Sequence, residues 1–155
     1  MIDDLYSTTI LTLAANLPHA GRLAEPEGTG ERVARLCGSR AIVDVVLDAE
    51  GRVADFAQDI KACALGQAAA GVLGESVIGA SVEELQSARD QTLAMLKSGG
   101  DGPAGRFEGL RALRQVADYP ARHASTLVAI EATLEAVSSV LAKRGADAGA
   151  RAGAA

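Results

Sequence analysis

The sequence predicts an α+β domain in which a small three-stranded antiparallel sheet packs against several helices. The first observation behind this prediction is an alternation in residues 40–48, where apolar side chains repeat at every second position. The second is the run Asp48-Ala49-Glu50-Gly51, which has the composition of a tight hairpin turn. The third is a helical stripe near the C-terminus with apolar residues at i, i+3 and i+4 spacing: Leu127, Ile130, Leu134, Val137 and Leu141.

The N-terminal half is expected to carry one helix and then the sheet. The helix covers residues 3–16 and ends before Leu17-Pro18, and residues 18–30, rich in Gly, Pro and Glu, are expected to form a loop. Three strands follow, over residues 31–37, 40–48 and 52–60. Three acidic residues of these strands are expected to lie on the face of the sheet that meets water: Asp44, Asp55 and Asp59.

The C-terminal half is expected to be helical. A small-residue helix covers 64–74, and Ser81 with Glu84 forms the capping box of a helix that runs to about Leu96. After a glycine-rich break, a short helical segment covers 107–116, and a long helix begins near Pro120 and packs its apolar stripe on the sheet. We assign residues 1–143 to a single domain. The remaining residues, 144–155, contain only Ala, Gly, Asp and Arg and predict a disordered tail.

Charge and composition exclude several classes of protein. A formal net charge of -5 argues against broad contact with nucleic-acid phosphates. No uninterrupted apolar run reaches the roughly 20 residues that span a bilayer, so we expect no membrane partner. The first residues lack the basic start and apolar stretch of a signal peptide, and we expect a cytoplasmic protein.

The two cysteines, Cys37 and Cys63, stand at the ends of predicted elements, where a thiol can face solvent or a metal. A structural disulfide is not expected in a reducing compartment, which leaves metal binding, reactivity or burial as a small apolar residue. Cys63 precedes a helix whose first amides lower the pKa of a thiol, and Lys61 is close in sequence. Gly38 permits a sharp turn directly after Cys37.

Five segments together resemble the U-type scaffold proteins of iron–sulfur cluster assembly, the family of IscU, SufU and the NifU N-terminal domain. They are Leu36-Cys37-Gly38, Asp48-Ala49-Glu50-Gly51, Ala62-Cys63-Ala64, Ile78-Gly79-Ala80-Ser81-Val82-Glu83-Glu84 and Tyr119-Pro120-Ala121-Arg122. The resemblance covers residues 3–143 and implies the IscU/SufU-like fold. It also implies one site built from three cysteines and a fourth ligand, acidic or histidine.

This chain departs from the family pattern at two of those positions. Ser39 stands where the family has aspartate after Cys-Gly, and Ser125 stands where it has the third cysteine. IscU-like members carry a histidine directly before that cysteine, whereas this chain has Ala124 there and His123 one position earlier. The resemblance therefore leaves Cys37 and Cys63 as thiolate ligands, with Ser125, Ser39 and His123 as weaker candidates.

The resemblance implies a scaffold that is not an enzyme. It would accept sulfur from a cysteine desulfurase, bind iron or a [2Fe–2S] cluster at Cys37 and Cys63, and pass the cluster to apo iron–sulfur proteins. A homodimer could supply four thiolates, two from each chain. Two alternatives remain open: an interaction or regulatory module that binds no cluster, and a zinc-dependent sulfur-transfer protein that uses Cys37, Cys63, His123 and water.

Overall fold

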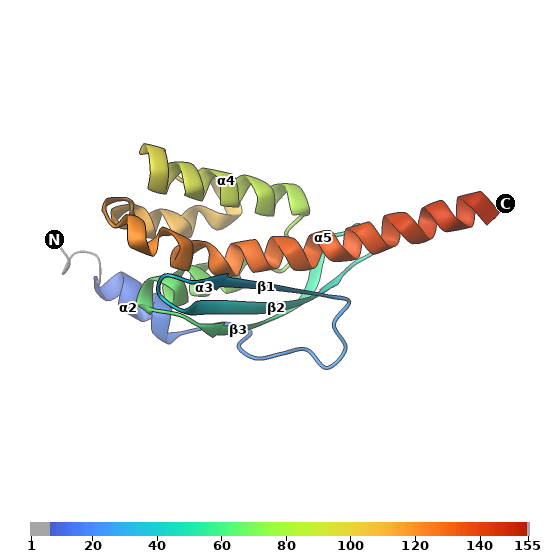
Figure 1. Ribbon diagram of the computed structural model, residues 1–155, viewed down its shortest axis with the longest axis horizontal. Helices are drawn as coiled ribbons and strands as arrows, with labels where there is room; N and C mark the ends of the chain where they lie inside the picture. The colour runs from blue at the N-terminus through green and yellow to red at the C-terminus, as the bar shows by residue number, and fades with distance from the viewer. Residues whose placement is uncertain (1–6, 155) are drawn as a thin grey trace.

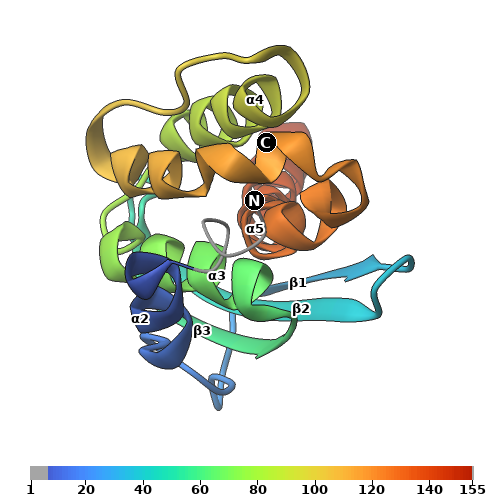
Figure 2. The same ribbon diagram turned by 90° about the vertical axis from the view of Figure 1, so that its left-hand side faces the viewer.

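The computed structural model describes residues 7–154 and, beyond residue 146, the backbone alone. The chain forms an α+β domain in which helices cover one face of a three-stranded sheet (Figure 1). The long helix α5, His123–Ala154, lies across β1 and β2 and also contacts α3. In Figure 2, α4 lies farther from the sheet than α5 and α3, so the helices form more than one layer. The predicted fold class is confirmed.

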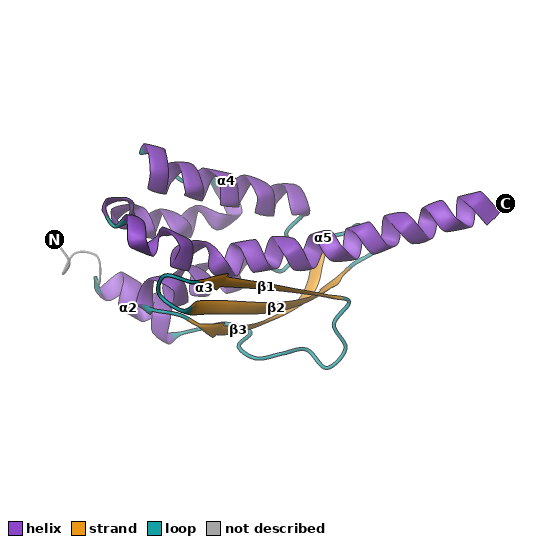
Figure 3. Ribbon diagram, in the orientation of Figure 1, coloured by secondary structure: helices purple, strands orange, loops and turns teal. Residues whose placement is uncertain are grey.

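The sheet has the order β1-β2-β3 and is antiparallel throughout. Its strands, orange in Figure 3, are β1 (Gly28–Ala34), β2 (Ser39–Leu47) and β3 (Val53–Lys61). The first strand begins and ends three residues earlier than predicted. Residues 35–38 form the turn to β2, because Gly38 adopts a φ of 74° and reverses the chain. Cys37 therefore lies in this turn and not at the end of a strand.

The helices follow the predicted order, with the first one shorter as far as it is described. They are α2 (Thr8–Ala15), α3 (Ala64–Ser76), α4 (Val82–Ser98), the 3₁₀ helices η1 (Gly105–Asp118) and η2 (Pro120–Arg122), and α5. Residues 3–6 of the predicted first helix lie outside the described residues. The capping box is present: the Ser81 hydroxyl accepts from the Glu84 backbone N–H, and the Glu84 carboxylate accepts from the Ser81 N–H. Gly99, at a φ of 72°, ends α4.

The segment over 107–116 is a 3₁₀ helix and not an α-helix. Its buried apolar residues recur at every third position: Phe107, Leu110, Leu113 and Val116. A 3₁₀ helix has three residues per turn, so this spacing places Leu110, Leu113 and Val116 on one face, while Phe107 lies at a kink with non-helical backbone angles. That face packs toward α3 and α4.

The central helix α5 packs very closely on β1 because β1 carries glycines at the crossing. A Cβ atom built on Gly28 would lie 2.6 Å from the Ala136 carbonyl oxygen. By length and composition alone, residues 120–146 could span a bilayer, contrary to the expectation from the sequence. However, 61% of the most apolar window is buried inside the domain, as in the core helix of a folded protein.

The backbone of α5 is helical through residues 145–154, where the composition predicts a disordered tail. The difference has a simple cause: alanine is the strongest helix former and extends an existing helix at little cost. The division into a domain over 1–143 and a separate tail over 144–155 stays a prediction.

Asp44 does not lie on the solvent-exposed face of the sheet, contrary to the prediction for it. Its side chain is fully buried and accepts hydrogen bonds from the Arg22 guanidinium at 2.7 Å and from the Thr29 hydroxyl at 2.6 Å. It also accepts from the Leu23 backbone N–H at 3.0 Å. Asp44 thus fixes the segment between α2 and β1 to the sheet, while Asp55 is exposed as predicted.

Candidate functional site

Four chain segments that are distant in sequence meet at one end of the domain. They are the turn between β1 and β2, the start of β2, the start of α3 and the first turn of α5, all at the left-hand end in Figure 1. Each contributes one polar side chain: Cys37, Ser39, Cys63 and Ser125, in that order. Figure 2 shows this end of the molecule facing the viewer.

The four side chains form one continuous row of polar contacts. The Cys37 Sγ lies 3.3 Å from the Ser39 Oγ, which lies 2.7 Å from the Ser125 Oγ. The Ser125 Oγ in turn lies 3.2 Å from the Cys63 Sγ. The two predicted thiols and both predicted serines are therefore brought together, although Ser39 and Ser125 are 86 residues apart in the chain.

The row runs between solvent and the interior. Cys37 is exposed and Cys63 is half-buried, whereas Ser39 and Ser125 are only 2% and 0% exposed. The sulfur atoms are consequently the accessible part of the site, and the hydroxyls lie behind them. Reagents that reach this corner meet a thiol first.

The pKa of Cys37 is lowered from its ordinary value. The largest cause is the side-chain hydrogen bond from Ser39, which stabilises the thiolate more than the partial burial of the sulfur destabilises it. The backbone N–H of Ser39 and the Ser125 hydroxyl add to the effect. Ser39 thus helps to hold Cys37 as a thiolate.

The pKa of Cys63 is also lowered, although its burial acts in the opposite direction and is the largest single influence. The hydrogen bond from Ser125 and the backbone N–H groups of Gly66 and Leu65 together outweigh that burial. Cys63 is the N-cap residue of α3, so these amides are the unpaired donors of the first helical turn. The start of α3 thus contributes to the lowering of the Cys63 pKa.

Gly66 makes the contact between Cys63 and Ser125 sterically possible. A Cβ atom at this position would lie 2.7 Å from the Ala62 Cβ and 2.9 Å from the Ser125 carbonyl oxygen. It would also lie 3.0 Å from the Ser125 Oγ. The absence of a side chain at Gly66 therefore lets α3 and α5 approach at the site.

Counting protons indicates what the row can do chemically. Three contacts join four groups, and each contact needs one proton. The two hydroxyls supply two of these protons and one sulfur supplies the third, so the other sulfur accepts. That sulfur is either a thiolate or a thiol whose proton points out of the row, as from the Cys37 Sγ toward the Ala34 carbonyl oxygen at 3.9 Å. The arrangement therefore suits one nucleophilic thiolate beside one thiol. If both serine hydroxyls rotate so that each donates in the opposite direction along the row, the charge lies on the other cysteine.

His123 does not join this row. It is 4% exposed, and its Nε2 lies 2.9 Å from the Val116 carbonyl oxygen and 3.3 Å from that of Ala117. Since carbonyl oxygens only accept, Nε2 carries the proton. The ring therefore donates to carbonyl groups in the last turn of η1. The buried Nδ1 has no hydrogen-bond partner in the described part of the chain. His19 lies apart as well, with its ring edge-on to Phe56.

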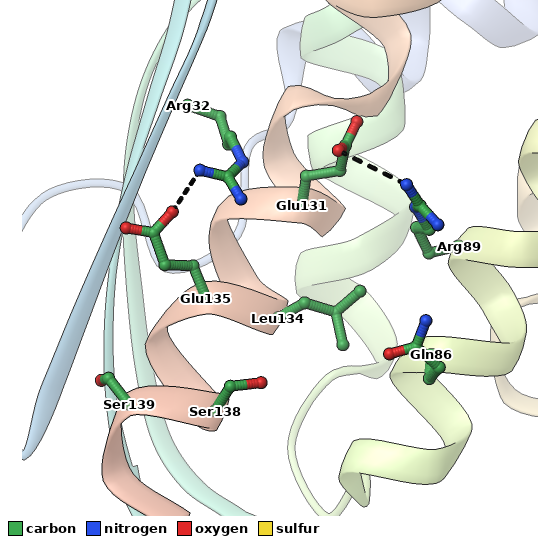
Figure 4. A pocket seen from close by; sticks show the side chains of 8 residues that line it. All are labelled: Arg32, Gln86, Arg89, Glu131, Leu134, Glu135, Ser138 and Ser139. Carbon is green, nitrogen blue, oxygen red and sulfur yellow. Dashed lines mark hydrogen bonds and ion pairs between the residues drawn. The ribbon is translucent and has the colours of Figure 1, made fainter. Parts of the chain in front are cut away.

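Among residues 7–154, no group of three or more His, Cys, Asp and Glu side chains is placed to hold a metal ion. A groove of about 560 Å³ lies elsewhere, between β1, α4 and α5 (Figure 4). Its charged side chains pair with one another, Arg32 with Glu135 and Arg89 with Glu131, and it contains no thiol. The chemistry of the thiol row therefore makes that row the candidate site.

The sequence of residues 5–126 matches the model of the NifU-like N-terminal domain family. The solved N-terminal domain of a nitrogen-fixing NifU-like protein from Brucella abortus is 43% identical, with a TM-score of 0.88 over 92% of this chain and 98% of that one. A second structure, titled only as a hypothetical protein, is 27% identical, with a TM-score of 0.75 over 86% of this chain and 97% of that one. No curated protein matches.

A third structure shares the fold at 20% identity, with a TM-score of 0.77 over 86% of this chain and 96% of that one. It is a candidate iron–sulfur cluster assembly scaffold of the SUF system from Fervidobacterium islandicum. The fold and the thiol row define a U-type scaffold domain. The chain belongs to the NifU-like N-terminal domain family, which confirms the resemblance drawn from its motifs.

Proposed function

We propose that this protein acts in iron–sulfur cluster assembly, where Cys37 and Cys63 accept sulfur and bind iron or a [2Fe–2S] cluster. The observation that carries the proposal is the row of contacts from Cys37 through Ser39 and Ser125 to Cys63. It occupies an accessible corner of a fold whose family contains cluster scaffolds. The protein would act as an assembly platform and not as an enzyme.

Sulfur acceptance follows from the state of the thiols. Both cysteines have lowered pKa values, so a thiolate is available to attack the outer sulfur of a persulfide on a cysteine desulfurase. The sulfur–sulfur bond of the donor breaks and the donor thiolate leaves. A new sulfur–sulfur bond holds the transferred atom on Cys37 or Cys63, with no external oxidant or reductant.

The proposed donor is a cysteine desulfurase and the proposed recipients are apo iron–sulfur proteins, in a reducing cytoplasmic setting that suits two free thiols. The two thiolates would bind iron, because thiolate is a soft ligand and the protein ligand that iron–sulfur clusters prefer. A zinc-dependent sulfur-transfer role would draw on the same two thiolates. His123 makes no hydrogen bond with the row: its Nε2 donates to the carbonyls of η1, and its Nδ1, the nitrogen left to bind a metal, has no partner in the described part of the chain.

Mass spectrometry of the intact protein tests sulfur acceptance. The full chain is incubated anaerobically with a cysteine desulfurase and L-cysteine, beside Cys37→Ser, Cys63→Ser and the double variant. We expect a mass increase of whole sulfur atoms in the parent and none in the double variant. Absence of added sulfur from the parent, with the desulfurase bound tightly, would instead favour the interaction module.

A further inference from the structure

The two thiols can supply electrons as well as bind sulfur. A persulfide carries its outer sulfur two electrons short of sulfide, whereas an iron–sulfur cluster contains sulfide. Cys37 and Cys63 are the only cysteines of the sequence, and both are free thiols in the structure. Two neighbouring thiols are a two-electron reductant, because together they can form a disulfide.

The sheet brings the two cysteines to the same end of one pair of strands. Arg40, near the start of β2, pairs with Lys61 at the end of β3, and the two strands are antiparallel. Cys37 comes three residues before Arg40, and Cys63 comes two residues after Lys61. Both cysteines therefore lie just beyond the same end of the β2–β3 pair.

The serine hydroxyls place the two sulfur atoms in one continuous row. The Ser39 Oγ lies 3.3 Å from the Cys37 Sγ, and the Ser125 Oγ lies 3.2 Å from the Cys63 Sγ. The two hydroxyl oxygens are 2.7 Å apart. Only these two small side chains join the sulfurs along the row, so a modest shift of one cysteine is enough to bring them together.

The turn that carries Cys37 is the part with room to shift. Residues 35–38 form this turn, Cys37 is exposed, and a Cβ atom built on Gly38 meets nothing within 4 Å. Cys63 is held as the N-cap residue of α3 and is half-buried. A disulfide requires Cβ atoms roughly 3.5–4.5 Å apart, and movement of the turn would provide that approach.

The difference in exposure assigns a separate role to each cysteine. Cys37 is the exposed thiol and meets a sulfur donor first, so it is the acceptor that becomes a persulfide. Cys63 lies behind it, at the inner end of the row, and is the thiol left to react with that persulfide.

We propose that this chain reduces the sulfur it accepts: the Cys63 thiol attacks the Cys37 Sγ of a Cys37 persulfide, forms a Cys37–Cys63 disulfide and releases sulfide. The inference deepens the proposed function and rests on it, because sulfur acceptance supplies the persulfide. The bond between the Cys37 Sγ and the outer sulfur breaks, and its electron pair leaves with the outer sulfur. The Cys63 proton passes to that sulfur, so one disulfide and one HS⁻ are formed. A dithiol reductant would return the disulfide to two thiols.

A limited sulfur transfer tests the proposal on the full reduced chain. After removal of the reductant, the protein is incubated anaerobically with a trace of cysteine desulfurase and an equimolar amount of L-cysteine. Released sulfide is measured as its bimane derivative, and the protein is alkylated and digested without a reductant for peptide mass spectrometry. We expect one HS⁻ for each sulfur accepted, together with a peptide pair linked through Cys37 and Cys63. Sulfur retained as a persulfide, or a disulfide between two chains, would overturn the proposal.

Two variants show whether Cys63 is the reductant. Cys63→Ser should keep the added sulfur as a persulfide on Cys37 and release at least tenfold less sulfide than the parent. Combining it with Ser138→Cys restores the number of thiols but places one at an exposed position of α5, about 20 Å along the helix from Ser125. This double variant should not recover the release. Release from either variant at the level of the parent would contradict attack by Cys63.

The outcome separates this inference from the proposed function. If the parent accepts sulfur from the desulfurase and keeps it as a persulfide, only the reduction step is wrong. If the desulfurase transfers no sulfur but cysteine persulfide still yields the disulfide and HS⁻, the reduction stands and the role in cluster assembly is wrong.

Discussion

The Ser39 and Ser125 hydroxyl oxygens lie 2.7 Å apart, and each also contacts a different cysteine sulfur. Two residues that replace ligands of the family pattern therefore bond to each other and hold the remaining thiols at one corner. The two hydroxyls connect the two cysteine side chains through one row of hydrogen bonds. The predictions below follow from that row and from the packing around it.

Ser39→Ala should raise the pKa of Cys37, because Ser39 provides the largest stabilisation of that thiolate. In the parent, the alkylation rate of Cys37 should reach half its maximum at a pH below the ordinary thiol value of 9.0. The variant should shift that midpoint upward toward 9.0. The measurement is the iodoacetamide rate of Cys37 against pH by peptide mass spectrometry, with Ser138→Ala, at an exposed position of α5, as the control. An unchanged midpoint would show that Ser39 does not stabilise the thiolate.

The stability of the fold should reflect the same shift. Because the pKa of Cys37 is lower in the folded chain, its thiolate contributes stability that is fully present above the unfolded value of 9.0. That contribution is lost as pH falls through the lower folded value.

Gly66→Ala should destabilise the fold by roughly 1–2 kcal/mol, because its Cβ would overlap Ala62 and Ser125. The matched control is Gly145→Ala, where a Cβ meets nothing within 4 Å. In that control, alanine should stabilise α5 by up to about 1 kcal/mol. Urea unfolding measures both variants. Equal effects at the two glycines would contradict the close approach of α3 and α5 at the site.

Asp44→Asn should cost about 1–3 kcal/mol at neutral pH, because buried hydrogen bonds to a charged group are lost. Burial alone would raise the pKa of Asp44, but the hydrogen bonds from Arg22, Thr29 and the Leu23 N–H outweigh it and lower the pKa below 3.8. The stabilisation is therefore present above pH 3.8 and disappears as pH falls through the lower folded value.

Urea unfolding of parent and Asp44→Asn at neutral and at strongly acidic pH checks this sign. The difference between the two proteins should shrink in acid. Asp59→Asn, at a partly exposed position of β3, serves as the control. A difference that stays constant with pH would mean that Asp44 is not held as a buried carboxylate.

Ser125→Cys should raise the affinity for ferrous iron or zinc at least about tenfold, since it adds a third soft ligand beside the other two. Competition with a chromophoric chelator measures the affinity. Ser138→Cys adds a thiol to an exposed position of the same helix and should leave the affinity unchanged. If the two variants bind equally, the Ser125 side chain does not face the metal.

Local patterns predicted most of the fold. The alternation over 40–48, the hairpin turn at Asp48 and the capping box at Ser81 each depend on neighbouring residues, and all three are present. Features set by distant contacts were missed. Leu36 and Cys37 continue an apolar run and look like strand, but the chain turns there at Gly38. Asp44 looks like a solvent-facing residue until Arg22 and Thr29 are seen to surround it.

The candidate site was predictable only through the resemblance to a family. Nothing local to Ser125 indicates a functional residue, and its contact with Ser39 spans 86 positions. Conversely, His123 at the start of α5 suggested a metal ligand, yet its ring donates a hydrogen bond to the Val116 carbonyl oxygen at the end of η1. A signal for that role is the three-residue spacing of Phe107, Leu110, Leu113 and Val116, which indicates a 3₁₀ helix with carbonyls to satisfy at its end.

The central claim is that Cys37 and Cys63 together form an iron–sulfur site. Its most direct test is the iron and acid-labile sulfide content after anaerobic reconstitution with ferrous iron, L-cysteine, a cysteine desulfurase and a thiol reductant. We expect both elements to be bound by the parent and lost from Cys37→Ala and from Cys63→Ala. Retention of iron and sulfide by either variant at the level of the parent would contradict the claim.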